Sequence, residues 1–177
     1  MHRLRMYGPA RAAVAPHAHS GFRSIASSAL IAVLILVLDQ VAKRLATTYL
    51  AQLPTQSTPV LGEALKLTYV MNRGAAFGVL QNQNVFFIIV SGVVIAVIVG
   101  SYRYSAMRSP LVNLALGLQL GGALGNLVDR LRLGYVVDFI ELPMWPVFNV
   151  ADSAICVGVA LLAYHLLRTP ERSPQST

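Results

Sequence analysis

Charged side chains are scarce in this chain. Only 12% of its 177 residues are charged, whereas 55% are apolar; an ordinary soluble domain has about a quarter of its residues charged. So few charges cannot cover the surface of a soluble domain of this length, and so apolar a chain is not intrinsically disordered. The composition therefore predicts a protein that lies mainly in lipid.

Residues that bind metals or form cross-links are also few. The single cysteine, Cys156, excludes a disulfide framework and a multi-thiolate zinc site. The four histidines are scattered and form no His-Glu-x-x-His pair of the metalloprotease type. We therefore expect no metal site, and we expect Cys156 to be a buried small residue in an apolar segment.

Four segments are long and apolar enough to cross a bilayer, which takes about 20 residues. They cover residues 24–42, 85–102, 109–128 and 147–167. The predicted fold is thus an α-helical integral membrane protein with four transmembrane helices. With four spans, both termini lie on the same side of the membrane.

The charges fall into two groups when they are sorted by side of the membrane. The side of the termini carries eight arginines and one glutamate: Arg3, Arg5, Arg11, Arg23, Arg103, Arg108, Arg168, Arg172 and Glu171. The other side carries equal numbers of basic and acidic residues, so the whole net charge of +7 lies with the termini. Because short cytoplasmic segments collect Lys and Arg, we expect cytoplasmic termini. No basic patch remains to indicate nucleic-acid binding.

The two ends of the chain differ from its middle. Residues 1–22 mix Pro, Gly, His and Arg without periodicity, and we expect a disordered basic cytoplasmic tail there. Residues 23–168 form the predicted membrane domain, and residues 169–177 a second cytoplasmic tail. A cleaved secretory signal is the alternative for the first apolar segment, but that segment runs into Asp39-Gln-Val-Ala-Lys43 instead of a small-residue cleavage site.

Four aspartates are predicted to lie at one membrane interface. Asp39 and Asp129 are near the ends of the first and third segments, and Asp152 is near the start of the fourth, so alternating helix direction brings them to the same depth. Asp138 lies in the apolar stretch 135–140, which could dip back toward the bilayer. A carboxylate costs about 2.5–3.5 kcal/mol at a helix centre, so such residues are usually paired or functional.

Further residues near this interface have spacings that indicate contacts. Lys43 follows Asp39 by four residues and can pair with it, in a structural or a functional role. Gly117, Gly121 and Gly125 recur at the spacing typical of closely packed membrane helices.

The segments that connect the spans carry two more signals. Asn126, Asp129 and Arg130 lie within about one turn, and we expect Arg130 to orient carboxylates through bidentate hydrogen bonds. Residues 65–70 are rich in β-formers and precede a turn at Asn72 and Gly74, so we expect a small β-sheet between the first and second helices.

Asp138 and Asp152 are the strongest candidates for a catalytic pair. Both have apolar neighbours, and when two carboxylates share a site one remains protonated while the other acts as a base. That is the chemistry of an aspartic protease. Asn149, three residues before Asp152, is placed to hydrogen-bond the pair. Proton or ion translocation through intramembrane acids is the main alternative, and a purely structural assembly protein is another.

Five ordered motifs now identify a resemblance. They are Asp39-Gln-Val-Ala-Lys43, Asn72-Arg-Gly-Ala-Ala-Phe77, Gly121-Gly-Ala-Leu-Gly-Asn-Leu-Val-Asp-Arg130, Val136-Val-Asp-Phe139 and Phe148-Asn-Val-Ala-Asp152. Over about residues 24–168 the chain resembles the bacterial lipoprotein signal peptidases, also called signal peptidase II.

The resemblance implies an aspartyl endopeptidase of the bacterial inner membrane. It would remove the signal peptide from diacylglyceryl-modified prolipoproteins by cutting just before the lipidated cysteine, without a metal or an organic cofactor. Asp138 and Asp152 match the family's catalytic residues, and the supporting positions are Asp39, Lys43, Asn72, Gly74, Asn126, Asp129, Arg130 and Asn149. The expected partners are diacylated prolipoproteins and membrane lipid. The protein is expected to be a monomer with its active site at the extracytoplasmic interface.

Overall fold

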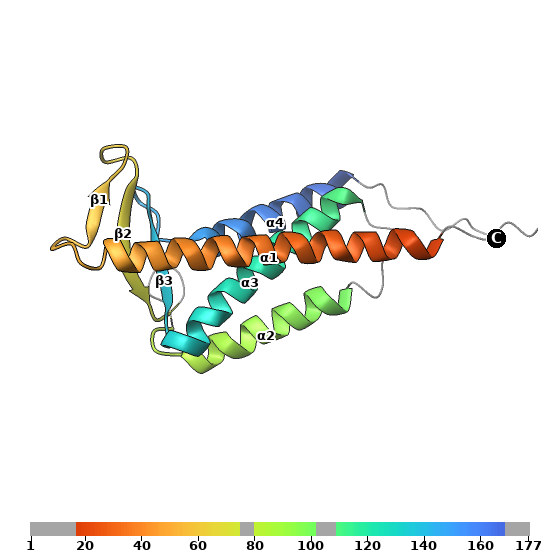
Figure 1. Ribbon diagram of the computed structural model, residues 1–177, viewed down its shortest axis with the longest axis horizontal. Helices are drawn as coiled ribbons and strands as arrows, with labels where there is room; N and C mark the ends of the chain where they lie inside the picture. The colour runs from red at the N-terminus through yellow and green to blue at the C-terminus, as the bar shows by residue number, and fades with distance from the viewer. Residues whose placement is uncertain (1–16, 75–79, 102–108, 169–177) are drawn as a thin grey trace, which may run out of the picture.

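The chain folds into four long helices with a small β-sheet at one end (Figure 1). The computed structural model describes residues 17–74, 80–101 and 109–168. The helices are α1 (His17–Tyr49), α2 (Asn84–Ser101), α3 (Pro110–Leu133) and α4 (Val150–Arg168), and the strands are β1 (Ser57–Pro59), β2 (Lys66–Asn72) and β3 (Val136–Glu141). Each helix contains a span long and apolar enough to cross a membrane, which confirms the predicted fold class.

The bundle is built around α3. Half of the apolar window of α3 is buried, against 17% for α1 and α4 and 6% for α2. Helices α1, α2 and α4 each pack on α3. Their outer faces expose large apolar side chains such as Leu30, Val93 and Val159, as expected for helices solvated by lipid. Helix α1 begins, and α4 ends, at the end of the bundle opposite to the sheet (Figure 1).

Glycines allow α3 to approach its neighbours closely. A Cβ on Gly121 would lie 2.6 Å from the carbonyl oxygen of Ala32 on α1, and one on Gly117 would lie 2.8 Å from the carbonyl oxygen of Ser28. The predicted close packing along this glycine repeat is confirmed. A second contact was not predicted: a Cβ on Gly122 would lie 2.4 Å from the carbonyl oxygen of Ala151 on α4.

The sheet is antiparallel with the strand order β1-β2-β3. The predicted strand between α1 and α2 is present as β2, but the third strand comes from the connection between α3 and α4. Residues 136–141, most of the stretch that we considered for a return toward the bilayer, form β3. This strand pairs with β2, for example Val137 with Met71, and the pairing satisfies its backbone N–H and C=O groups.

One face of the sheet rests on the end of α1. Phe139 and Val137 of β3 and Tyr69 of β2 form a buried cluster with Ala46 and Leu50 of α1. Asp138 lies between Val137 and Phe139 in the strand, and successive side chains of a strand point to opposite faces. The sheet therefore directs Asp138 away from this apolar cluster.

The helix boundaries differ from the prediction in several places. Helix α1 already includes residues 17–22, which we had assigned to the disordered tail; residues 1–16 and 169–177 lie outside the described residues. Helix α3 continues to Leu133 and ends at Gly134, whose φ of 80° suits glycine. Cys156 is exposed on the outside of α4 and not buried as expected.

The close approach of α1 and α3 gives a first prediction. Gly121→Ala should destabilise the protein by about 1–3 kcal/mol, because the added methyl group overpacks against the backbone of α1. Thermal unfolding of the purified protein in detergent measures the effect. Gly92→Ala on α2 is the matched control, since a Cβ there meets nothing within 4 Å. Equal stability of the two variants would contradict the packing described.

Candidate active site

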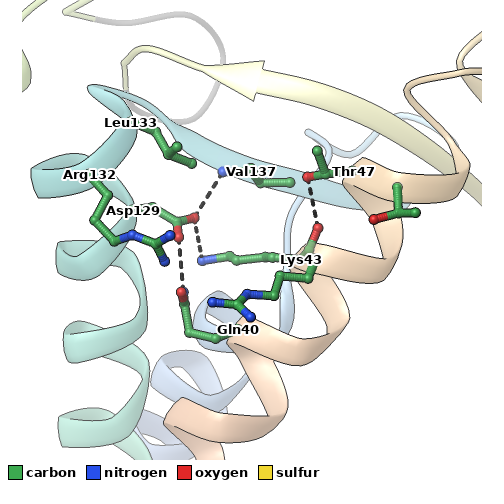
Figure 2. A pocket seen from close by; sticks show the side chains of 9 residues that line it. Gln40, Lys43, Thr47, Asp129, Arg132, Leu133 and Val137 are labelled. Carbon is green, nitrogen blue, oxygen red and sulfur yellow. Dashed lines mark hydrogen bonds and ion pairs between the residues drawn. The ribbon is translucent and has the colours of Figure 1, made fainter.

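A cluster of buried charges joins α1 to α3 beneath the sheet (Figure 2). Lys43 Nζ lies 2.8 Å from Asp39 Oδ2 and 2.9 Å from Asp129 Oδ2. The side chains of these three residues are at most 5% exposed. Lys43 also donates a 2.9 Å hydrogen bond to Asn126 Oδ1. The expected pairing of Asp39 with Lys43 is therefore present, and it includes a second carboxylate.

The two carboxylates of this cluster also hold backbone segments. Asp39 Oδ1 accepts a 2.9 Å hydrogen bond from the backbone N–H of Ala151, the neighbour of Asp152. Asp129 Oδ2 accepts one of 3.1 Å from the backbone N–H of Val137, the neighbour of Asp138. The cluster thus fixes the chain next to each of the two candidate catalytic aspartates.

Asp152 lies in the first turn of α4, in a reciprocal cap with Asn149. Asn149 Oδ1 accepts a 2.9 Å hydrogen bond from the backbone N–H of Asp152, while Asp152 Oδ2 accepts one of 3.3 Å from the backbone N–H of Asn149. This is a capping box in which Asn and Asp take the usual places of Ser or Thr and Glu. The N-terminal end of α4 favours a negative charge at Asp152.

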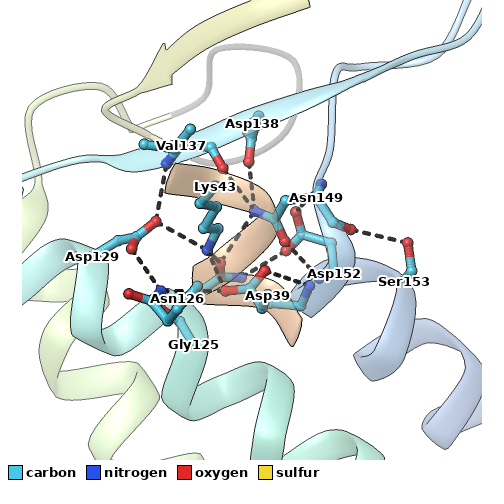
Figure 3. A network of polar contacts seen from close by, with 12 residues as sticks. Asp39, Lys43, Gly125, Asn126, Asp129, Val137, Asp138, Asn149, Asp152 and Ser153 are labelled. Atoms are coloured by element: carbon cyan, nitrogen blue, oxygen red, sulfur yellow. Dashed lines mark hydrogen bonds and ion pairs between the residues drawn. The ribbon is translucent and has the colours of Figure 1, made fainter. Parts of the chain in front are cut away.

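Asn149 brings Asp138 and Asp152 together (Figure 3). Its Nδ2 donates a 2.6 Å hydrogen bond to Asp138 Oδ1, and the same residue caps Asp152. Asn126 Nδ2 donates to Asp152 Oδ1 at 2.7 Å, and Asn72 Nδ2 donates to Asp138 Oδ2 at 2.8 Å. Each carboxyl group therefore has a side-chain amide of its own in addition to the shared Asn149.

The two carboxyl groups lie in different surroundings. Asp138 is only 1% exposed, whereas Asp152 is partly accessible. Burial, and after it the negative charge of Asp152, raises the pKa of the Asp138 carboxyl to about 7, although the hydrogen bonds from Asn72 and Asn149 oppose this shift. Asp138 can thus hold a proton near neutral pH.

Gly74 fixes the amide of Asn72. The backbone N–H of Gly74 donates a 3.0 Å hydrogen bond to Asn72 Oδ1, which leaves Nδ2 of Asn72 directed at Asp138. The turn predicted at this point therefore orients a group that contacts Asp138. Residues 75–77 of the same motif lie outside the described residues.

Arg130 does not have the contacts we predicted. Within the described residues its guanidinium forms no ion pair with a carboxylate; it lies 4.9 Å from the centre of the Phe87 ring on α2. The bidentate contact we expected is therefore absent, because α2 offers the guanidinium an aromatic face.

The contacts of Gln40 and Gly125 with the buried charges were not predicted from the sequence. Gln40 Nε2 donates to Asp129 Oδ1 at 2.9 Å and to the carbonyl oxygen of Gly125 at 3.2 Å. Gly125 is needed for space, because a Cβ there would lie 2.6 Å from Asp39 Oδ2. Gln40 lies in the motif Asp39-Gln-Val-Ala-Lys43, but that motif gives little indication of its contacts, since the partners of Gln40 lie on another helix. Among the described residues, no group of three or more His, Cys, Asp and Glu side chains is placed to hold a metal ion.

Comparisons with known proteins agree on one family. The family model for signal peptidase II matches residues 31–168. The chain is 51% identical over 138 residues to the lipoprotein signal peptidase of Moorella thermoacetica, covering 78% of this chain and 91% of that protein. It is 43% identical over 137 residues to that of Halothermothrix orenii, covering 77% and 92% of the two chains.

Solved structures show the same arrangement. A bacterial membrane enzyme, solved by the in meso method at 2.3 Å resolution, superposes with a TM-score of 0.77 at 34% identity and covers 86% of this chain and 95% of its own. These matches, with the four spans, define the protein as an aspartic peptidase of the membrane. The chain belongs to the signal peptidase II family, whose members cleave signal peptides from prolipoproteins.

The buried charges beneath the sheet give a second prediction. Lys43→Met should cost about 3–5 kcal/mol of unfolding free energy, because it leaves the carboxylates of Asp39 and Asp129 buried without a cation. Lys66→Met is the matched control: its ion pair with Glu63 is on the surface, and its loss should change stability little. Thermal unfolding of both variants in the same detergent tests this, and equal loss in the two would contradict it.

Proposed function

We propose that Asp138 and Asp152 are the catalytic pair of this peptidase. The observation that carries the proposal is the position of Asn149, which hydrogen-bonds both residues. Its side-chain amide donates to the carboxyl group of Asp138, and its backbone N–H donates to the carboxyl group of Asp152. Two carboxyl groups bound to one residue in this way can act on a single water molecule and a single peptide bond. Pairs of this kind hydrolyse amides without a covalent intermediate.

The surroundings of the two carboxyl groups support different roles for them. Asp138, with its raised pKa, holds a proton, and Asp152 at the N-terminal end of α4 is the base. Asp152 takes a proton from water, the water oxygen attacks the carbonyl carbon of the scissile bond, and Asp138 gives its proton to the carbonyl oxygen. Asp152 then gives the proton that it took from water to the leaving nitrogen as the C–N bond breaks, and Asp138 takes back a proton from a hydroxyl group of the tetrahedral intermediate.

The remaining polar residues position this pair. Lys43, Asp39 and Asp129 hold the backbone beside the two catalytic residues. Asn72, Asn126 and Asn149 orient the carboxyl groups. We assign Gly74 to the turn that orients Asn72, and Arg130 to the packing of α2 on α3.

The substrate follows from the depth of the site. The catalytic residues lie where the sheet meets the ends of the apolar spans, so a peptide bond reaches them at a membrane interface. We propose that the substrate is a prolipoprotein whose cysteine carries a diacylglyceryl group, and that the cut falls just before this cysteine. The acyl chains and the apolar signal helix would hold that bond at the required depth.

The distribution of charge supports the orientation of the chain. Residues 23–168 form the catalytic unit, and the arginine-rich termini are proposed to lie in the cytoplasm of a bacterial inner membrane. The site then faces the extracytoplasmic side, where we expect the protein to act as a monomer. The hydrogen bonds from Asn72, Asn126 and Asn149 to the two carboxyl groups all form within one chain, which supports a monomer.

Replacement of either catalytic residue tests the pair. Asp138→Asn and Asp152→Asn should each lower cleavage by about 10²–10⁴-fold, the usual contribution of a general acid or base, while the protein still accumulates in the membrane. Glu63→Gln is the control, because it removes an exposed acid from the same end of the molecule. Near-normal cleavage by either aspartate variant would disprove the assignment.

The pH profile tests the roles. Because the pKa of Asp138 is raised to about 7, this residue keeps its proton below that pH, and kcat should fall as the pH rises through about 7. Asn72→Ala removes a hydrogen bond that lowers this pKa, so the alkaline limb should move to higher pH even if the maximal rate drops. An unmoved limb, or one shifted to lower pH, would contradict Asp138 as the acid.

Parallel incubation with two substrates tests the specificity. Purified protein should process a diacylated prolipoprotein and leave the unlipidated form of the same precursor uncut. Asp152→Asn with the diacylated form serves as the blank. Equal processing of both precursors would show that the lipid is not recognised, and it would leave the catalytic pair itself unaffected.

A further inference from the structure

A hollow outside the catalytic site lies between α1 and α3, near the sheet. It has a volume of about 260 Å³, and polar residues line it with much of their apolar surface. The lining residues are Gln40, Lys43, Arg44, Thr47, Thr48, Asp129, Arg132, Leu133 and Val137. Neither Asp138 nor Asp152 lines it. Arg132 extends from α3 toward the hollow (Figure 2). The catalytic pair therefore does not account for the residues that line this hollow.

The formal net charge at the hollow is positive. Lys43 at its floor pairs with Asp39 and Asp129, a cluster with one excess negative charge, and the two arginines that line the hollow reverse this sign. Arg44 and Arg132 are exposed, and within the described part of the chain no carboxylate lies within ion-pair distance of either guanidinium. Two arginines from different helices thus line one hollow without a partner. Guanidinium groups of this kind bind phosphate through two parallel hydrogen bonds.

Simple structural roles account for only part of this arrangement. Arg132 is in the last turn of α3, where a basic residue stabilises the helix end. Arg44 is a full turn before the end of α1 and gains no such benefit. A common anionic ligand explains both positions.

The surface of α1 next to the hollow is apolar. Val41, Val37 and Leu34 lie three, seven and ten residues before Arg44, on the same side of the helix and toward the middle of the span. All three are 49–58% exposed. The hollow is smaller than the about 300–1,000 Å³ of most ligand pockets, so it suits a headgroup whose chains remain outside, along these apolar residues.

We propose that Arg44 and Arg132 bind the headgroup of an anionic phospholipid in this hollow. The two guanidinium groups hold the phosphodiester, and one acyl chain lies along Val41, Val37 and Leu34. The floor of the hollow includes Asp129, which also holds the backbone beside Asp138. The bound lipid therefore lies next to the network that positions the catalytic residues, and its binding does not depend on the proposed cleavage reaction.

Lipid binding to the delipidated full chain in detergent tests the site. Native mass spectrometry with phosphatidylglycerol should show one retained lipid, and the doubly substituted Arg44→Gln/Arg132→Gln protein should lose about 30-fold in preference for it over phosphatidylcholine, given the usual contribution of two basic residues at a membrane surface. Arg168→Gln, at the opposite end of the bundle, is the matched control and should bind as the unsubstituted protein does.

Two further arms decide the chemistry and the source of the ligand. The Arg44→Lys/Arg132→Lys protein keeps both positive charges but loses the bidentate hydrogen bonds of the guanidinium groups. Its preference for phosphatidylglycerol over phosphatidylcholine should therefore lie between those of the unsubstituted protein and the Gln double variant. Inorganic phosphate, added at the same concentration as the phosphatidylglycerol that saturates the site, should not displace the bound lipid. Unchanged lipid preference in the Gln double variant, equal binding of phosphatidylcholine by the unsubstituted protein, or equally tight binding of inorganic phosphate would each overturn the proposal.

Discussion

The structure depends on one buried cation held between two carboxylates. Lys43 contacts Asp39 and Asp129, and each of these acids also accepts a hydrogen bond from a backbone N–H beside one of the two proposed catalytic residues, Asp152 and Asp138. Removing charges from water is costly, and attraction between the partners offsets that cost only when every group is satisfied. The residues that join α1 to α3 therefore also hold the backbone beside Asp138 and Asp152.

The sheet is the other half of this arrangement. Strand β3 carries Asp138, and its pairing with β2 brings Asn72 to that carboxyl group. The apolar face of the sheet rests on α1, so the strand cannot slip by one residue without turning Asp138 toward the apolar cluster. The pairing of the strand thus fixes the direction of the side chain that we propose as one of the two catalytic groups.

Much of this architecture could be predicted from the sequence, and the failures have physical reasons. Long apolar runs determine the spans, and the glycine repeat determines the approach of α1 to α3. A run such as residues 135–140 is ambiguous, since its partner strand is far away in the chain. The direction of the Arg130 side chain depended on Phe87 of another helix. The reciprocal cap was visible as Asn-x-x-Asp, but its link to Asp138 required the fold.

Asn149 serves both the folding of α4 and the geometry of the site, with its backbone and its side chain engaged at once. Any replacement that alters its contact with Asp138 also weakens the start of the helix that bears Asp152. Resistance to an inhibitor that binds this side chain would therefore be hard to acquire by mutation of Asn149. A resistant enzyme would have to remain folded without the cap at the start of α4.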